Sequence, residues 1–138
     1  MKIEGIQRVV FAVNDLEKAR ERFSELLGVS FIDHGVHEEF GLQAMVSEDW
    51  TVELITPVGP NSPVTSYLES RGEGIFGFSV YVKDIEDTRA DVTAKGYRFT
   101  TDVLDFGPVD NWKVFKEMGL DPNEAYGAHI VFVQAEPK

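Results

Sequence analysis

Apolar and polar residues alternate along the chain in a pattern that occurs twice. The segment 80–89 (VYVKDIEDTR) repeats the pattern of the segment 11–20 (FAVNDLEKAR), 80 − 11 = 69 positions later. In each copy an alternating apolar run leads through an acidic turn into a charged amphipathic segment, which ends at Gly28 or at Gly96. Because a repeat at a fixed offset dictates architecture, this one predicts an α+β fold of two tandem βαβββ modules.

The first module is predicted over residues 1–57. Its segment 6–13 alternates with period two and predicts a strand. A helix is expected next, because Asn14 and Glu17 have the spacing of a capping box and apolar residues then recur at helical spacing as far as Gly28. Three further strands are predicted, at 29–33, 40–46 and 50–56.

A segment rich in glycine and proline, 58–73, is predicted to link the modules. Ser62 followed by Pro63 is typical of a helix start, so a short helix is expected within the linker. The second module is predicted over 74–138. Its expected elements are a strand at 75–82, a helix at 84–95 and strands at 97–101, 112–116 and 128–134. The segments 102–111 and 118–127 are compatible with either loop or short helix.

Composition narrows the classes of protein and partner. With 138 residues, 43% of them hydrophobic, the chain can bury one domain-sized core. The absence of cysteine excludes disulfides, thiolate metal sites and a cysteine nucleophile. A formal charge of −11 disfavours nucleic acid and favours cationic small molecules, although surplus carboxylates also serve solubility. We expect a cytoplasmic protein without a membrane segment, since no apolar run is long enough to span a bilayer and no signal-peptide pattern precedes the first strand.

Motifs along nearly the whole chain resemble one known family. The most specific is 69–75 (ESRGEGI), and others are 12–17 (AVNDLE), 53–57 (ELITP) and the segment 122–134. The chain is similar in these places to the vicinal oxygen chelate superfamily of glyoxalases, extradiol dioxygenases and bleomycin resistance proteins, and most of all to its methylmalonyl-CoA epimerase branch. The resemblance implies two βαβββ modules around a shared concave mixed sheet, a small-molecule ligand in the cavity between the modules, and a homodimer.

The resemblance also implies four positions for a divalent metal, one on the first strand and one on the last strand of each module. These positions fall on Arg8, Glu53, Gly77 and Val131. Arginine presents only donors, and glycine and valine offer no lone pair, so Glu53 is the one residue able to ligate a cation. A single carboxylate would hold a hard cation weakly, and we therefore predict neither a metal nor another cofactor.

The proton-transferring carboxylate of the epimerase branch falls near Gln43 or Ala44, neither of which can transfer a proton at neutral pH. Epimerase activity is therefore not expected. Two other titratable residues remain as catalytic candidates, His129 and Glu53. The complete predicted ligand-binding set is Arg8, Glu53, Gly77, Ser79, Tyr81, His129 and Val131.

Arg8 and Glu53 are expected to face one another, and two interpretations stay open. In the first they form a structural ion pair, because a buried charge must be compensated. In the second the guanidinium anchors an oxyanion of a ligand, for which the missing side chain at Gly77 leaves room. His34 and His37 are expected in a solvated acidic loop.

The function that these residues favour is metal-independent binding of a small organic molecule. Two alternatives stay open because fold alone does not fix function. One is a metal-free isomerase, lyase or cyclase that uses side chains of the cavity. The other is an antibiotic-sequestering resistance protein, which would suit the acidic composition.

Overall fold

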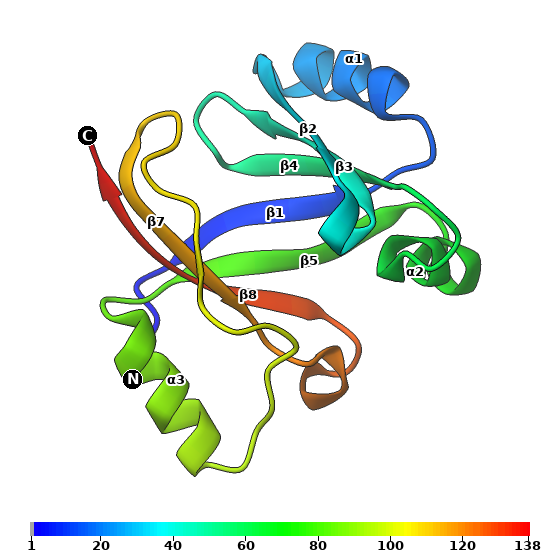
Figure 1. The fold of residues 1–138 in the computed structure, drawn as a ribbon. Helices are drawn as coiled ribbons and strands as arrows, with labels where there is room; N and C mark the ends of the chain where they lie inside the picture. The colour runs from blue at the N-terminus through cyan, green and yellow to red at the C-terminus, as the bar shows by residue number, and fades with distance from the viewer. Residues whose placement is uncertain (1) are drawn as a thin grey trace. The chain divides into compact units, whose positions relative to one another are not determined.

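The computed structural model describes residues 2–138, and this part of the chain forms eight strands, three α-helices and two 3-10 helices (Figure 1). The predicted α+β class is confirmed. In chain order the elements are β1 (Ile6–Ala12), α1 (Leu16–Leu27), β2 (Phe31–His37), η1 (Glu38–Phe40), β3 (Leu42–Ser47), β4 (Val52–Pro57), α2 (Pro63–Arg71), β5 (Gly74–Tyr81), α3 (Ile85–Ala94), β6 (Leu104–Asp105), β7 (Trp112–Gly119), η2 (Pro122–Ala125) and β8 (His129–Pro137).

The chain divides into two compact units, an N-terminal unit of residues 8–76 and a C-terminal unit of residues 77–138 with 2–7. Strand order is β2-β3-β4-β1 in the N-terminal unit and β6-β7-β8-β5 in the C-terminal unit. Within each unit the first strand pairs in parallel with the last, while the remaining pairs are antiparallel. The same βαβββ unit therefore occurs twice, as the repeat predicts.

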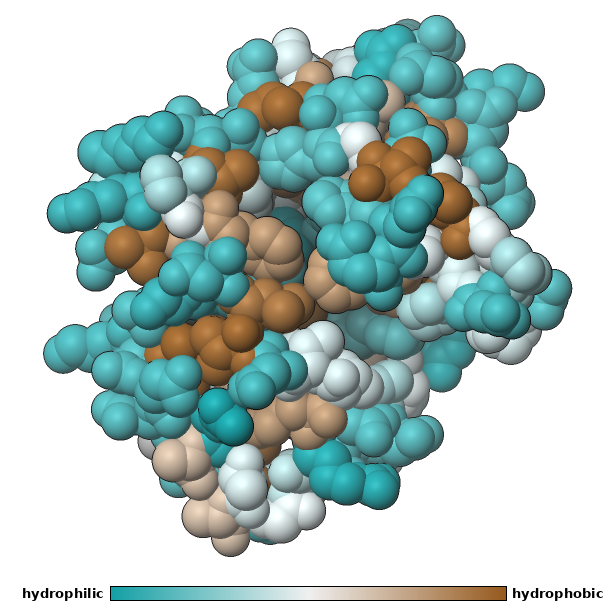
Figure 2. All heavy atoms as spheres, viewed as in Figure 1, coloured by the Kyte–Doolittle hydropathy of each residue, from teal (hydrophilic) through white to brown (hydrophobic). Residues whose placement is uncertain are grey.

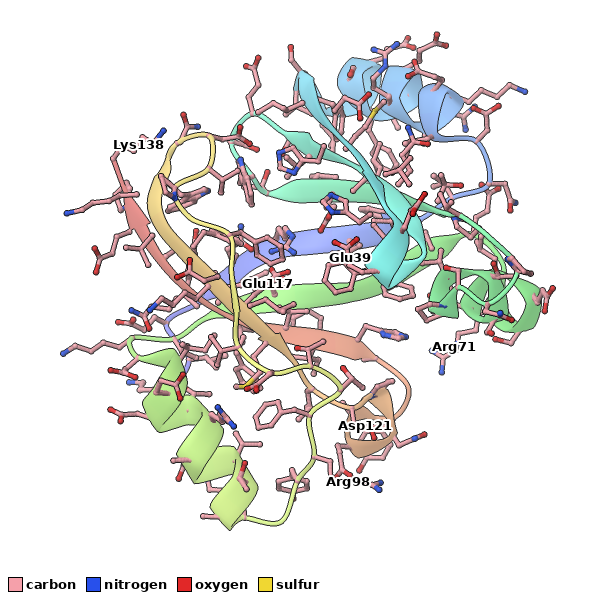
Figure 3. All side chains as sticks on the ribbon, viewed as in Figure 1. Glu39, Arg71, Arg98, Glu117, Asp121 and Lys138 are labelled. Atoms are coloured by element: carbon pink, nitrogen blue, oxygen red, sulfur yellow. The ribbon has the colours of Figure 1, made fainter. Side chains whose placement is uncertain are left out.

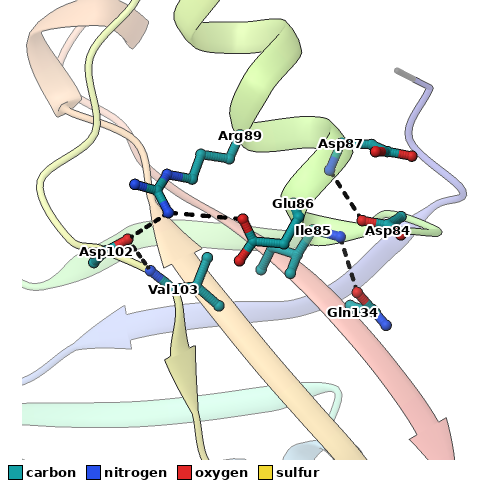
Figure 4. Close-up of polar contacts among 8 residues, drawn as sticks. All are labelled: Asp84, Ile85, Glu86, Asp87, Arg89, Asp102, Val103 and Gln134. Atoms are coloured by element: carbon teal, nitrogen blue, oxygen red, sulfur yellow. Dashed lines mark hydrogen bonds and ion pairs between the residues drawn. The ribbon is translucent and has the colours of Figure 1, made fainter.

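The two repeated helices begin in the same way. The Asp15 and Asp84 side chains accept the backbone N–H of Lys18 at 3.1 Å and of Asp87 at 3.0 Å. These N-caps are 84 − 15 = 69 positions apart, the offset of the repeat. Each cap satisfies one backbone donor that the helix itself leaves unpaired. Figure 4 shows the cap of α3 and, beside it, the Gln134 side chain accepting the N–H of Ile85.

The predicted capping box of Asn14 and Glu17 is wrong by one residue. The backbone N–H of Asn14 donates instead to the Glu73 carboxylate at 2.9 Å, which ties the β1–α1 turn to the start of β5. The predicted end of the helix is confirmed, because Gly28 adopts the left-handed conformation that closes α1.

The core of the N-terminal unit lies on both faces of its sheet. The face toward α1 packs Leu16 and Phe23 against Leu54 and Met45. The opposite face is apolar as well, where α2 contributes Val64. The buried members of this second cluster are Val10, Ala12, Ala44, Ile55 and Val64.

The core of the C-terminal unit lies between α3 and one face of its sheet. Val80 and Phe132 from the sheet pack there with Ile85 and Val92 from the helix. The segment after α3 is held to the helix by Arg89, whose Nη1 lies 3.0 Å from the Asp102 carboxylate (Figure 4).

Two predicted elements differ from the structure. The segment 97–101 forms no strand and pairs only through an isolated bridge between Phe99 and Leu120. The reason is that the Gly119 N–H donates to the Thr101 hydroxyl, so a side chain replaces the backbone acceptor that a ladder needs. The short strand of this region is β6 instead, and the ambiguous segment 118–127 contains η2.

The second difference concerns His34 and His37, which lie on β2 and not in a loop. The strand continues through a bulge after Asp33, whose carboxylate accepts the N–H of Gly35 at 2.7 Å. A bulge lets a strand bend without ending, which explains why the polar residues did not interrupt it.

The surface agrees with the acidic composition. Figure 2 shows hydrophilic side chains over most of the viewed face, with apolar groups in scattered patches. Within residues 2–138 no helix combines the length and the apolar character that crossing a membrane requires.

The β3–β4 turn yields a prediction about pH. Asp49 accepts hydrogen bonds from the Ser47 hydroxyl at 2.6 Å and the Thr51 hydroxyl at 2.7 Å, and these bonds lower its pKa below the ordinary 3.8. The ionised carboxylate therefore stabilises the fold above that pH, and the contribution is lost as pH falls through the lowered pKa. We expect Asp49→Asn to reduce the free energy of unfolding by about 0.5–1 kcal/mol at neutral pH, since the turn is exposed.

Urea titrations of the wild type and Asp49→Asn at neutral pH and near pH 3 measure this effect. The difference between them should shrink in acid. Glu38→Gln is the matched control, because the Glu38 carboxylate is exposed and accepts no hydroxyl hydrogen bond from residues 2–138. A difference that does not change with pH would contradict the assignment.

Candidate functional site

A buried ion pair joins β1 to β4 in the N-terminal unit. The Arg8 Nε donates to Glu53 Oε1 at 2.7 Å, and the side chains are 8% and 16% exposed. The parallel register places Val10 beside Glu53, so Arg8 lies two positions earlier on the same face of β1. The predicted pairing of Arg8 with Glu53 is confirmed.

The buried apolar neighbours of Arg8 and Glu53 strengthen the attraction between the two charges. Glu53 stands opposite Val46 of β3, and the neighbouring positions on this face are Val10 and Ile55, all of them buried. Because the pair is largely withdrawn from water, the attraction between its charges is greater than at the surface. Either charge alone would be costly to bury.

The two candidate positions for the epimerase base lie on opposite faces of β3. Ala44 pairs with Ile55 and shares the face of Glu53, whereas Gln43 pairs with Thr56 and lies on the other face. Ala44 belongs to the apolar cluster beside Val10. A methyl group thus lies on the Glu53 face and an amide on the other, and neither group can transfer a proton at neutral pH.

The C-terminal unit presents the other predicted residues on one face of its sheet. Val80 and Phe132 point into the core below α3, so Ser79 and Tyr81 of β5 and Val131 of β8 point the opposite way. The parallel register sets Ser79 beside Val131 and Gly77 beside His129. The strand phase predicted for these residues therefore agrees with the structure.

Gly77 does not provide the room for a ligand that its missing side chain was expected to leave. A Cβ atom at this position would lie 1.9 Å from the backbone oxygen of His129 and 2.9 Å from the His129 Cβ. Glycine is needed here because β8 approaches β5 so closely. For the same reason no larger side chain, a metal-ligating histidine included, fits without movement of the backbone.

Ser79 lies at the centre of this face. It is 0% exposed, and its hydroxyl finds no hydrogen-bond partner among residues 2–138. A buried hydroxyl without a partner costs about 1–3 kcal/mol. A water molecule or a polar group of a ligand would supply the missing bond.

Glu117 is a polar residue of this face that sequence reasoning missed. It pairs with Val133, which in turn pairs with Tyr81, so the three residues form one row across β7, β8 and β5. Figure 3 labels Glu117, and its side chain is half-buried. The predicted strand ended at Lys116. The period-two alternation nevertheless continues beyond it, because Glu117 shares a face with Phe115 while the buried Met118 lies on the other face.

The metal expected of the family does not fit these residues. In the N-terminal unit, Oε1 of Glu53 is bound by the Arg8 guanidinium, whose positive charge would repel a cation. In the C-terminal unit, Val131 has no donor atom and Gly77 has no space for one. No group of three or more His, Cys, Asp or Glu residues within 2–138 is arranged to hold a metal, and His37 reaches only the Glu39 carboxylate at 3.7 Å.

Comparison with known proteins identifies the family. The model of the glyoxalase/bleomycin resistance protein/dioxygenase superfamily matches residues 7–115, most of the chain, and the chain belongs to this superfamily. The mitochondrial methylmalonyl-CoA epimerase of Mus musculus is 26% identical over 137 residues, which cover 97% of this chain and 75% of the mouse protein.

Solved structures of epimerases share the fold. Methylmalonyl-CoA epimerase from Mycobacterium tuberculosis matches with a TM-score of 0.82 at 22% identity, over 98% of this chain and 90% of that one. A variant of the Streptomyces coelicolor epimerase in complex with 2-nitronate-propionyl-CoA matches with a TM-score of 0.80 at 22% identity, over 96% and 98% of the two chains. The resemblance read from the sequence motifs is thereby confirmed.

The ion pair predicts strong energetic coupling between Arg8 and Glu53. Arg8→Met or Glu53→Gln alone should lower the free energy of unfolding by about 3–5 kcal/mol, because each leaves a buried polar or charged group without its partner. The double variant should lose much less than the sum. Denaturant unfolding of the wild type and the three variants measures the coupling, and additive losses would show that the two residues act independently.

The close approach at Gly77 predicts a second stability effect. Gly77→Ala should destabilise the protein by about 3 kcal/mol or more, since the methyl group meets a backbone oxygen that cannot swing aside. Gly119→Ala is the matched control, because there the nearest atom is the Thr100 hydroxyl, a movable group at 3.1 Å. Equal thermal stability of the two variants would refute this reading of the β5–β8 contact.

Proposed function

We propose that the chain is a small-molecule-binding member of this superfamily in which Arg8 takes the role of the metal. The observation that carries the proposal is the buried guanidinium held by Glu53 at 2.7 Å. Superfamily metals attract oxygen atoms of a ligand by positive charge, and a guanidinium supplies that charge together with directed N–H donors. A ligand with a carboxylate or a similar oxyanion suits such an anchor.

Glu53 has a definite part in this proposal. By accepting the Nε–H it fixes the plane of the guanidinium and therefore the direction of its Nη donors. It also keeps the arginine charge compensated when no ligand is bound. In this role Glu53 orients the Arg8 guanidinium. It is therefore a poor candidate for the catalytic proton transfer for which its sequence position made it a candidate.

The proposal favours binding, or chemistry without a metal, over epimerisation. Ala44 provides no base on the Glu53 face. A metal-free isomerase, lyase or cyclase remains the second candidate because Glu117 and His129 bring titratable groups to one face of the C-terminal sheet. We place the protein in the cytoplasm on the same sequence grounds as above. No residue of the described chain specifically favours antibiotic sequestration.

Methylmalonyl-CoA is a suitable first probe, because it carries a free carboxylate and because a related epimerase has been solved in complex with it. We expect calorimetric titration to show binding that is unchanged by chelators. Propionyl-CoA, which lacks the carboxylate, should bind at least about tenfold more weakly if the oxyanion contact contributes about 1.4 kcal/mol or more.

Two variants distinguish the role of Arg8 in ligand binding from its role in the stability of the fold. The double variant Arg8→Met with Glu53→Gln removes the anchor together with the carboxylate that orients it, and it should lose the preference for methylmalonyl-CoA. Arg8→Lys keeps the charge but loses the planar donor set, and it should show an intermediate affinity. Binding abolished by chelators, or a carboxylate preference that survives in the double variant, would contradict the proposal.

Proton exchange at C2 of methylmalonyl-CoA tests whether the protein catalyses epimerisation. In deuterated water, NMR of methylmalonyl-CoA with the protein should show no exchange of the proton at C2 beyond the rate without protein. Rapid exchange would establish an epimerase-like base and would refute a purely binding role.

A further inference from the structure

Arg71 is an exposed arginine in the last turn of α2, and the role given to Arg8 leaves it unexplained. It belongs to the segment 69–75, the most specific of the sequence motifs. Within residues 2–138 Arg71 makes no ion pair, although the chain carries a formal charge of −11. Its guanidinium lies instead over the ring of Tyr67, with Cζ 5.6 Å from the ring centroid. A basic residue in this turn also complements the helix dipole, but that effect requires no ring beneath it.

The ring of Tyr67 is fixed from two sides. Its hydroxyl donates to the backbone carbonyl of Ile75, and the ring meets that of Phe76 in a T-shaped contact with centroids 5.1 Å apart. The face of an aromatic ring attracts a cation. Arg71 therefore has a preferred position although it is exposed, and its N–H donors bond to no residue within 2–138.

Tyr67 and Phe76 connect Arg71 to the sheet face that carries Arg8. Both rings pack against the apolar cluster that includes Val10 of β1. Because side chains alternate along a strand, Arg8 and Val10 share one face. The two arginines therefore border the same apolar cluster of the N-terminal unit. Since both rings are only half-buried, part of this apolar surface can contact another molecule.

Arg8 and Arg71 lie toward opposite ends of β1. Arg8 is near the start of the strand. At the other end, the carboxylate of Glu73, two positions after Arg71, accepts the N–H of Asn14 at 2.9 Å. A strand rises about 3.3 Å per residue, so the six positions from Arg8 to Asn14 span up to about 20 Å. Because both arginine side chains are long, oxyanions that contact both guanidinium groups are expected roughly 10–15 Å apart.

We propose that Arg71 is a second oxyanion anchor and that the ligand is a dicarboxylate with an apolar spacer. The inference rests on the proposed function, in which Arg8 binds the first carboxylate. A guanidinium binds a carboxylate through paired N–H donors, and the apolar side chains between the two arginines suit a hydrocarbon spacer. A carboxylate fits Arg71 better than a phosphate does, because Glu69 and Glu73 flank it in the sequence and repel a second negative charge.

Acids of equal length with one or two carboxylates test the inference. Calorimetric titration of the wild type compares sebacate, which carries a carboxylate at each end, with decanoate, which carries one. Sebacate should bind at least about tenfold more tightly, because it makes one further charge-assisted contact. Succinate should show no such gain over butyrate, because its two carboxylates are too close together to reach both arginines.

Arg71→Gln removes the second anchor and should abolish the difference between sebacate and decanoate. Arg71→Lys keeps the charge without the planar donor set, so an intermediate difference is expected. Arg22→Gln is the matched control and should keep the preference for sebacate. Arg22 is likewise an exposed helical arginine of the N-terminal unit, but its helix α1 packs on the opposite face of the sheet. Circular dichroism verifies that each variant keeps its helices.

The outcomes separate this inference from the proposed function. Equal affinities of the wild type for sebacate and decanoate, or a preference for sebacate that survives Arg71→Gln, would overturn the second anchor and leave carboxylate binding at Arg8 in place. If neither acid binds, or if the double variant Arg8→Met with Glu53→Gln binds both as the wild type does, the proposed function falls together with this inference.

Discussion

The buried pair of Arg8 and Glu53 is the constraint on which the chemistry of the N-terminal unit depends. A carboxylate that is 16% exposed among valine and isoleucine side chains needs a positive partner. In a metal-binding relative that partner is expected to be the cation. Here a side chain of the adjacent strand supplies the charge, at 2.7 Å and in a bond whose geometry the parallel register fixes.

The residues at the family's other metal-ligand positions are consistent with the replacement of the metal by Arg8. Once a guanidinium compensates Glu53, donor atoms at the other metal positions have no cation to hold. Val131 offers none, and at Gly77 the backbone of β8 occupies the space that a side chain would require. Neither Ala44, on the Glu53 face of β3, nor Gln43, on the opposite face, provides a proton-transferring carboxylate. Within the N-terminal unit, Val10, Ala44 and Ile55 share an apolar sheet face with the Arg8 guanidinium, an arrangement that suits recognition of an oxyanion better than proton abstraction from carbon.

Local signals explain which parts of the molecule could be predicted from the sequence. The repeat, the end of α1 at Gly28 and the Ser62 cap of α2 depend on residues close together in the chain, and they were predicted correctly. The pairing of Arg8 with Glu53 is a long-range contact, yet strand phase and the family resemblance sufficed to predict it. Glu117 was missed because the end of β7 is set by pairing with β8, which propensity alone does not report.

The sequence predictions that were wrong share one cause, which is a competing contact from a distant part of the chain. Glu73 takes the N–H of Asn14 and so shifts the helix cap by one residue. The Thr101 hydroxyl takes the N–H of Gly119 and prevents the strand predicted at 97–101. The carbonyl of His129 gives Gly77 a packing role where the sequence indicated space for a ligand. In each case a single hydrogen bond or backbone contact, invisible to periodicity, overrides a reasonable local prediction.

The internal repeat provides a comparison for the two surface helices, because α1 and α3 begin from equivalent caps. At an offset of 69 positions Lys18 and Arg22 correspond to Asp87 and Asp91, while Glu21 and Glu25 correspond to Ala90 and Ala94. The positions that face the sheet stay apolar in both helices, as Leu16 and Ile85 show. Folding of the βαβββ unit therefore requires the apolar stripe and the cap but not the alternating charges.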